Sequence, residues 1–147
     1  MDGSGYDKAE ASPGFLFWRA FNDWSHSLRV ELEKIGLTQA QYSILAAVSY
    51  LGSAAEVVSQ QDVSNQLSMD KMMVSDVVKT LEKKGMLKRN PHPYDGRAVA
   101  LQLTFEARRA LKVAIPLVEA IDEGFFGKLG PDKLKVLKQL LVDLGAT

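Results

Sequence analysis

The sequence predicts a mainly α-helical fold in which a small two-stranded β element precedes the last two helices. Apolar residues recur at three- and four-residue steps in several separate stretches, which is the period of an α-helix. Two of the predicted helices, over residues 60–67 and 69–84, are separated by hardly more than one residue. A stretch with strand-like alternation, residues 99–103, then interrupts the helical pattern.

The N-terminal part is predicted as an arm followed by two helices. Residues 1–13 are small, polar and rich in Gly and Ser, so we expect a disordered arm. The first helix starts near residue 15 and ends at Gly36, where glycine supplies a left-handed cap. Thr38 and Gln41 have the spacing of a capping box and begin the next helix, which ends at Gly52. The apolar stripe of the first helix consists of Trp18, Phe21, Trp24, Leu28, Leu32 and Ile35.

A helix-turn-helix is predicted in the middle of the chain. Ser59 is expected to cap the helix over residues 60–67, and Ser68 the helix over residues 69–84, which ends at Gly85. Two helices joined by so tight a turn are typical of a helix-turn-helix. The second helix is expected to bury one face, formed by Val74, Val77, Val78 and Leu81.

A pair of strands is predicted directly after this motif. Residues 86–90 form a short extended run, and the two prolines that flank His92 exclude a helix there. Asp95-Gly96 is a turn signal, and residues 99–103 alternate as a strand does. Strand, loop and strand after a helix-turn-helix form a wing, so residues 37–103 are predicted to be a winged helix-turn-helix domain.

Two further helices follow, and they carry more apolar surface than the winged domain needs. Thr104 is expected to cap a long helix, in which Pro116 leaves the Lys112 carbonyl without its donor and should produce a kink. The last helix carries leucines at the spacing of a coiled-coil seam: Leu134, Leu137, Leu141 and Leu144. We therefore predict that residues 14–36 and 104–147 form a helical dimerisation region. The alternative is that these helices fold back on their own domain.

Composition excludes several classes of protein. The chain has 147 residues, of which 46% are hydrophobic and 24% charged, as expected of a globular domain. It has no cysteine and two histidines, which excludes a disulfide framework, thiolate catalysis and a cysteine-ligated zinc site. No apolar run approaches the length of a membrane span, and no export signal is present, so a cytoplasmic location is expected. Without a phosphate loop, a nucleophile elbow or a metal-ligand set, we expect no enzyme, metal or cofactor. The pair Asp122-Glu123 is expected to lie in a solvated turn.

The charge is unevenly distributed although the whole chain is neutral, with 18 basic and 18 acidic residues. Residues 71–97 carry seven basic and three acidic side chains, a net charge of +4. Such a polarised surface can steer an anionic partner, whereas the plainer interpretation is a solvated helix face.

The segment from Met69 to Gly85 resembles the recognition helix of the MarR (multiple antibiotic resistance regulator) family, most closely in its ending Leu81-Glu82-Lys83-Lys84-Gly85. Asp95-Gly96-Arg97, followed by Leu101-Gln102-Leu103-Thr104, is similar to the wing of that family. The order of elements matches over about residues 14–145. The resemblance implies a homodimeric transcription regulator on a pseudo-palindromic site in double-stranded DNA, in many cases a repressor released by a small ligand.

The resemblance and the predicted helix faces nominate residues for contact with DNA. Lysines suit phosphate oxygens, Ser75 can bond several base edges, and Met72 can touch a thymine methyl. Arg97 matches the wing arginine of the family and suits a narrow minor groove, with Asp95 orienting it through a charge-assisted bond. The alternatives are solvated lysines, methionines that fill the core, and an arginine in a structural ion pair. The nominated residues are Lys71, Met72, Ser75, Asp76, Lys79, Lys83, Arg89, His92 and Arg97.

Two positions depart from the family pattern. Asp76 stands where many relatives carry arginine or a neutral amide, and a carboxylate there is repelled by phosphates unless it accepts from cytosine N4 or orients a lysine. Gly96 stands where relatives often have a basic residue. These departures and the zero net charge support a second hypothesis: a dimeric protein-interaction or antagonist module that has lost specific DNA binding.

The family places its effector pocket between the dimerisation helices and the winged domain. An aromatic-lined cleft there would suit a small aromatic or phenolic ligand, with His26 as a polar anchor. The alternative is that these aromatic residues belong to the core. The candidates are Trp18, Phe21, Trp24, His26, Tyr42 and Met72.

Overall fold

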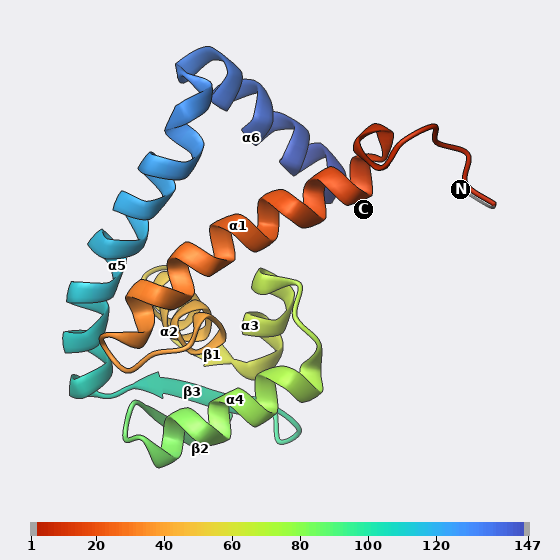
Figure 1. Ribbon diagram of the computed structural model, residues 1–147. Helices are drawn as coiled ribbons and strands as arrows, with labels where there is room; N and C mark the ends of the chain where they lie inside the picture. The colour runs from red at the N-terminus through yellow and green to blue at the C-terminus, as the bar shows by residue number, and fades with distance from the viewer. Residues whose placement is uncertain (1–2, 146–147) are drawn as a thin grey trace. The chain divides into compact units, whose positions relative to one another are not determined.

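The computed structural model describes residues 3–145, so the first two residues of the predicted arm and the last two of the predicted dimerisation region lie outside the described part. The chain forms two compact units. The winged unit comprises Glu31–Leu117, and the helical unit comprises the residues up to Val30 together with those from Val118 onward. Both boundaries fall inside long helices, α1 (Pro13–Glu33) and α5 (Phe105–Phe126), which therefore contribute to both units (Figure 1).

The helices of the winged unit begin where the sequence provides caps. The Thr38 hydroxyl accepts from the Gln41 amide, and the Gln41 side chain accepts from the Thr38 amide, so the predicted capping box of α2 (Gln39–Gly52) is confirmed. Ser59 and Asp62 form a second capping box at the start of α3 (Gln60–Leu67). Gly36 has a φ of 77°, as expected for the predicted left-handed cap.

The turn of the helix-turn-helix differs from the prediction at Ser68. This residue ends α3 in the left-handed conformation, with φ 49°, and does not cap the next helix. The cap of α4 (Lys71–Lys83) is Asp70, whose Oδ1 accepts from the amides of Met72 and Met73 at 2.8 and 3.3 Å. The Ser64 hydroxyl donates to the Met69 carbonyl at 2.6 Å and closes the turn. Serine and aspartate are both good N-caps, and the local pattern could not rank them.

The wing belongs to a sheet of three strands, whereas two were predicted. The strands β1 (Val58–Ser59), β2 (Leu87–Pro91) and β3 (Val99–Leu103) are antiparallel, with β3 in the centre. Leu87 pairs with Leu103 across the wing, and Val58 pairs with Leu101 on the other edge. Strand β1 is only two residues long and buried on both, so no alternation marks it in the sequence.

The core of the winged unit is closed by side chains from every one of its helices and from the sheet. Lys84 at the end of α4 also ties the unit together, because its ammonium group donates to the Gly36 carbonyl and to Gln41 Oε1, the latter at 3.1 Å. The fully buried large side chains of this unit are Leu32, Ile44, Leu45, Val63, Val74, Val78, Leu81 and Leu87.

The helical unit consists of a short 3₁₀ helix η1 (Ala9–Ala11), the first part of α1, the end of α5, η2 (Gly127–Leu129) and α6 (Pro131–Gly145). Asp122 does not lie in a solvated turn as expected. It is a half-buried residue of α5, and its Oδ1 accepts from Trp24 Nε1 at 2.8 Å. The Trp24 ring contacts Phe21 and Phe126, with ring centroids 5.9 and 6.3 Å apart. Within residues 3–145, no helix is long and apolar enough to cross a membrane.

Candidate nucleic-acid interface

Helix α4 presents one face to the core and the other to solvent. Val74, Val78 and Leu81 are completely buried, so the rotation of the helix about its axis is fixed by packing. Asp70 at its start satisfies two free amides, and its negative charge is favourable at a helix N-terminus. The opposite face consists of half-buried Ser75 and the exposed residues Lys71, Met72, Met73, Asp76, Lys79 and Lys83.

The lysines of this face are free to bind an anion. Among residues 3–145 the ion pairs are Lys34–Glu31, Arg89–Glu82 and Arg109–Glu106, so none of them engages an α4 lysine. Met72 is 72% exposed and therefore does not fill the core, which was the alternative considered for it. An exposed row of lysines beside a thioether and a hydroxyl offers phosphate contacts together with contacts to base edges.

Asp76 lies exposed in the middle of this row. Its backbone carbonyl accepts from the Thr80 hydroxyl at 3.2 Å, and its carboxylate has no hydrogen bond or ion pair within the described part of the chain. Of the two roles that the sequence suggested for Asp76, orienting a neighbouring lysine is therefore not observed. The geometry leaves the Asp76 carboxylate available to accept a hydrogen bond from a partner molecule.

Arg89 is held by Glu82, which the sequence analysis did not consider. Arg89 Nε and Nη2 both donate to Glu82 Oε1, at 3.2 and 3.1 Å, and the Arg89 amide donates to Oε2 at 3.2 Å. The side-chain hydrogen bonds from Arg89 lower the pKa of Glu82 below its usual value. This pair joins β2 to the last turn of α4 and so fixes the wing relative to the predicted recognition helix. Glu82 and Arg89 are seven residues apart on either side of the turn at Gly85, and this short separation could have indicated the ion pair in the sequence.

The wing loop, residues 92–98, is organised by Asp95 in a different way from the one expected. Asp95 Oδ1 accepts from the backbone amide of Arg97 at 3.0 Å, and the Ala98 amide donates to the Asp95 carbonyl at 3.1 Å. The predicted charge-assisted bond from Asp95 to the Arg97 guanidinium is wrong, because Arg97 takes part in no ion pair among residues 3–145. Asp and Asn side chains in turns commonly accept a hydrogen bond from the backbone amide two residues ahead. Asp95 forms this local bond in place of an ion pair with the Arg97 side chain.

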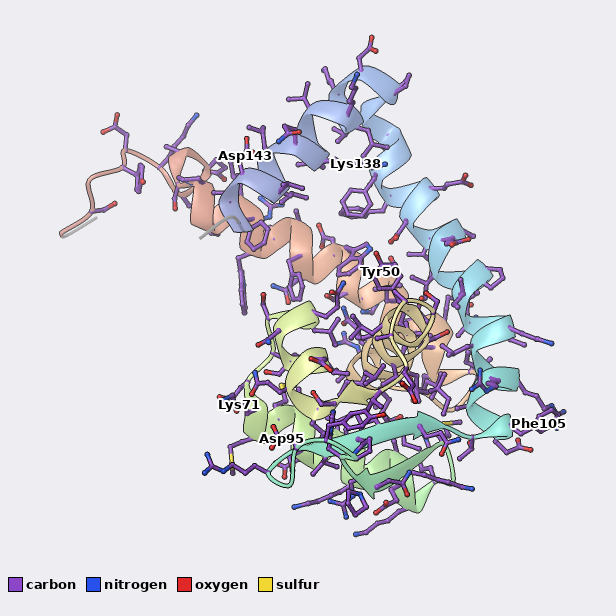
Figure 2. All side chains as sticks on the ribbon, turned by 180° about the vertical axis from the view of Figure 1, so that it is seen from behind. Tyr50, Lys71, Asp95, Phe105, Lys138 and Asp143 are labelled. Atoms are coloured by element: carbon purple, nitrogen blue, oxygen red, sulfur yellow. The ribbon has the colours of Figure 1, made fainter. Side chains whose placement is uncertain are left out.

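The structure brings two of the predicted DNA contacts to one cleft. Lys71 at the start of α4 and Arg97 in the wing line a cleft of about 170 Å³ together with Gln60 and Gln61 at the start of α3. Figure 2 labels Lys71 and Asp95 at this end of the winged unit. Gln60 Oε1 is buried there without a hydrogen-bond partner in the described residues. The sequence analysis missed both glutamines, although their place at a helix start beside the recognition helix could have indicated them.

The effector candidates are divided between the two units. Phe21 and Trp24 line an apolar cleft of about 590 Å³ within the helical unit, which also includes Phe17, Phe125 and Phe126. Trp18 is 66% exposed, and His26 Nδ1 lies 3.2 Å from Arg29 Nη2 on the same helix. Tyr42 and Met72 belong to α2 and α4 of the winged unit. A common pocket for all six residues stays a prediction.

Comparison with known proteins places the chain among transcription regulators. The sequence model of the MarR family matches residues 37–99, and the chain is 37% identical over 123 residues to the uncharacterized HTH-type transcriptional regulator YdcH of Bacillus subtilis, covering 84% of each protein. This chain belongs to the MarR family. It is a MarR-family transcriptional regulator with a winged helix-turn-helix fold, as the resemblance of its recognition helix and wing implied.

Solved structures of MarR-family regulators have the same fold. BpsR of Bordetella bronchiseptica, whose DNA binding is regulated by 6-hydroxynicotinic acid, superimposes with a TM-score of 0.87 at 26% identity over 98% of this chain and 99% of BpsR. A mutant MarR from E. coli complexed with operator DNA gives a TM-score of 0.81 at 23% identity over 92% of this chain and 95% of that one.

Proposed function

We propose that this MarR-family regulator binds a pseudo-palindromic operator in double-stranded DNA as a homodimer and represses transcription in the cytoplasm until a small ligand releases it. The observation that carries the proposal is the exposed face of α4, with Lys71, Lys79 and Lys83 outside ion pairs in the described residues and Arg97 across a cleft from Lys71. Such a face fits the major groove, and a wing arginine fits the adjacent minor groove.

Each residue of the interface has a distinct chemical part in the proposal. Lys71, Lys79 and Lys83 bind phosphates and position the protein without reading sequence. Ser75 and Met72 contact base edges, and Asp76 accepts from the N4 amino group of a cytosine. Arg97 enters the minor groove, and His92 lies in the loop that carries it. Arg89 contacts the DNA backbone only through the guanidinium N–H groups that Glu82 leaves free.

The dimer is supported by the apolar surface of the helical unit. No residue of α6 is buried, and Val136, Leu140 and Leu144 lie exposed at four-residue intervals along one face of this helix. Phe17, Trp18 and Phe21 are also exposed on α1. Apolar patches of this kind on a soluble protein mark interaction surfaces, and a second copy of the same chain is the occupant that also supplies a second reading helix for the operator.

The proposed effector is a small aromatic or phenolic compound. Aromatic side chains line the cleft of the helical unit, and a flat ligand can stack on such rings. BpsR, which is similar over nearly its whole length, is regulated by an aromatic acid. If a ligand weakens DNA binding, the DNA must weaken ligand binding by the same factor, so a titration of the ligand with and without operator tests this part.

One observation favours a second candidate function. The exposed Asp76 carboxylate on the DNA-facing helix has no partner within residues 3–145, and the net charge of the chain is zero. An uncompensated carboxylate is repelled by phosphates. The alternative function is therefore a dimeric interaction or antagonist module that no longer reads DNA.

Selection of binding sites from a random duplex pool, followed by a salt titration on the selected site, separates the two functions. The proposed regulator enriches a pseudo-palindrome and binds it with a steep salt dependence, because several phosphates are neutralised by each copy. Enrichment of no sequence, with weak binding to every duplex, would support the interaction module instead.

A further inference from the structure

The wing loop is folded around the side chain of His92. Its Nδ1 accepts two hydrogen bonds, from the backbone amides of Tyr94 and Asp95, each at 3.1 Å. The His92 amide donates to the Ala98 carbonyl at 3.2 Å across the loop, and its ring meets the Tyr94 ring edge-on, with centroids 6.1 Å apart. Together with the two bonds that Asp95 accepts, these contacts define the loop that carries Arg97.

Two amides that converge on one ring nitrogen fix the protonation state of the ring. In this arrangement Nδ1 presents its lone pair to both amides, which requires the tautomer with its proton on Nε2. Protonation would place a hydrogen on Nδ1 opposite two N–H donors, and both hydrogen bonds would be lost. Histidine is the side chain whose charge ordinarily changes between about pH 5 and pH 8.

The surroundings of His92 offer the protonated ring no compensating ion pair. The charged or titratable groups of its own loop are Tyr94, Asp95 and Arg97, and Lys71 of α4 shares a cleft with Arg97. Glu56 and Arg108 line a second cleft together with Pro91 and Pro93, which flank His92. The residues of β3 that pair with the end of β2, Val99 and Ala100, carry no charge. Within the described chain, no carboxylate forms an ion pair with the His92 ring.

We propose that His92 is a positioning residue that makes the wing a proton-sensitive part of DNA binding. The neutral ring holds residues 94–97 in the conformation that presents Arg97, and protonation releases this loop and weakens binding to the operator. The inference rests on the proposed DNA-binding function, since it concerns the regulation of the same surface.

The first measurement follows the loop without DNA. The chain has two histidines, so a titration is readily assigned. Amide NMR shifts of Tyr94 and Asp95 are recorded in the full chain between about pH 8 and pH 5.5. They are expected to move together with the His92 ring signals in the native chain. In His92→Asn the side-chain oxygen can accept the same amides but cannot be protonated, so these shifts should stay constant. Equal movement in His92→Asn would overturn the proposal.

The second measurement is the affinity for the selected operator at both pH values and constant ionic strength. The native chain should bind about fivefold or more weakly at the lower pH because two hydrogen bonds are lost, and His92→Asn should be nearly insensitive. His92→Phe, which removes the acceptor, should bind weakly at both pH values. Because Arg89 lowers the pKa of Glu82, that ion pair keeps its charge over this range.

Two results would count against the regulatory role. Tighter binding at the lower pH that disappears in His92→Asn would mean that the imidazolium contacts a phosphate, which overturns the proposed release. Coupled amide shifts with unchanged affinity would overturn the link to DNA. If no operator is selected at all, the proposed function fails, whereas the amide titration still supports or overturns the role of His92 within the wing.

Discussion

The two units of the chain bury their apolar residues to very different degrees. Helix α4 of the winged unit has three completely buried side chains, whereas α6 of the helical unit has none. Both helices are amphipathic, so the difference does not arise from their patterns. It arises from what surrounds them, since α4 packs within a closed core formed by this chain and α6 leaves five of its seven leucine and valine residues exposed. A strong apolar stripe thus predicts that a helix face is buried, but it does not indicate whether that face packs against the same chain or against another molecule.

Truncating the core of the winged unit should have the largest effect on stability. Leu81→Ala removes a completely buried side chain and is expected to lower the free energy of unfolding by about 3 kcal/mol. Met72→Ala on the exposed face of the same helix should change it by less than about 0.5 kcal/mol. Urea unfolding followed by circular dichroism measures both. Similar losses for the two variants would mean that α4 is not anchored as described.

A charge on the exposed face of α6 should break the dimer while leaving each copy folded. Leu140→Glu places one carboxylate from each copy in the proposed symmetric interface. Because burying these charges is unfavourable, the dimer dissociation constant should rise about 100-fold. Gln139→Glu adds the same charge one position away and serves as the control, although it also removes the hydrogen bond from Gln139 to Asp143. Sedimentation velocity over a concentration series measures the association. Equal behaviour of both variants, or a monomeric native chain, would contradict a dimer through this face.

Asp76 tests whether the recognition helix reads bases. Asp76→Asn exchanges an acceptor for a group that also donates, so preference at one base pair of the operator should change by about tenfold. Competition binding with operators varied at each position gives the comparison. A uniform gain in affinity for every sequence would show that Asp76 only repels phosphates, which is the behaviour expected of the interaction module.

Arg97 tests whether DNA binding resides in the winged unit alone. Arg97→Ala should weaken binding and reduce the slope of log affinity against log salt by about one, as the loss of one phosphate contact does. Lys128→Ala in the helical unit, where the ammonium lies 4.5 Å from the Phe125 ring centroid, should leave the slope unchanged. An unchanged slope in Arg97→Ala would assign this residue a structural role.

The smallest effect is expected inside the helical unit. Trp24→Phe keeps most of the ring but leaves the half-buried Asp122 carboxylate without its donor, at a cost of about 1 kcal/mol. Tyr50→Phe, at a position of the winged unit that is 69% exposed, should be nearly neutral. Thermal unfolding of the two variants measures the difference, and equal melting temperatures would mean that the Trp24–Asp122 bond contributes nothing to stability.

The sequence predicted those parts of the molecule that depend on local patterns. The capping box at Thr38, the left-handed Gly36 and three of the four residues of the predicted buried face of α4 follow from spacing within a few residues, whereas Val77 is only half-buried. The third strand was missed because two buried residues carry no period of their own. The Trp24–Asp122 bond was missed because its partners are 98 positions apart, and only the folded chain brings such residues together.

The candidate site was predicted less completely than the fold, and the reason is competition among partners. Each basic residue was assigned to DNA by its type and position, but a guanidinium can equally bind a carboxylate of the same chain. Arg89 binds Glu82 in this way, and Asp95 uses a nearby backbone amide in place of the Arg97 side chain. Sequence identifies the donors and acceptors of a surface, whereas geometry decides which of them remain available for another molecule.

The two helices shared between the units have a mechanical consequence. Two units joined by a flexible loop can move independently, whereas a continuous helix couples the motion of the residues along it. The boundary in α5 falls immediately after Leu117, next to Pro116, whose missing amide leaves the Lys112 carbonyl without a helical donor. Bending costs least at such a residue. Pro116 is therefore the residue at which α5 is expected to bend most easily, and in the proposed dimer such a bend would alter the spacing of the two recognition helices.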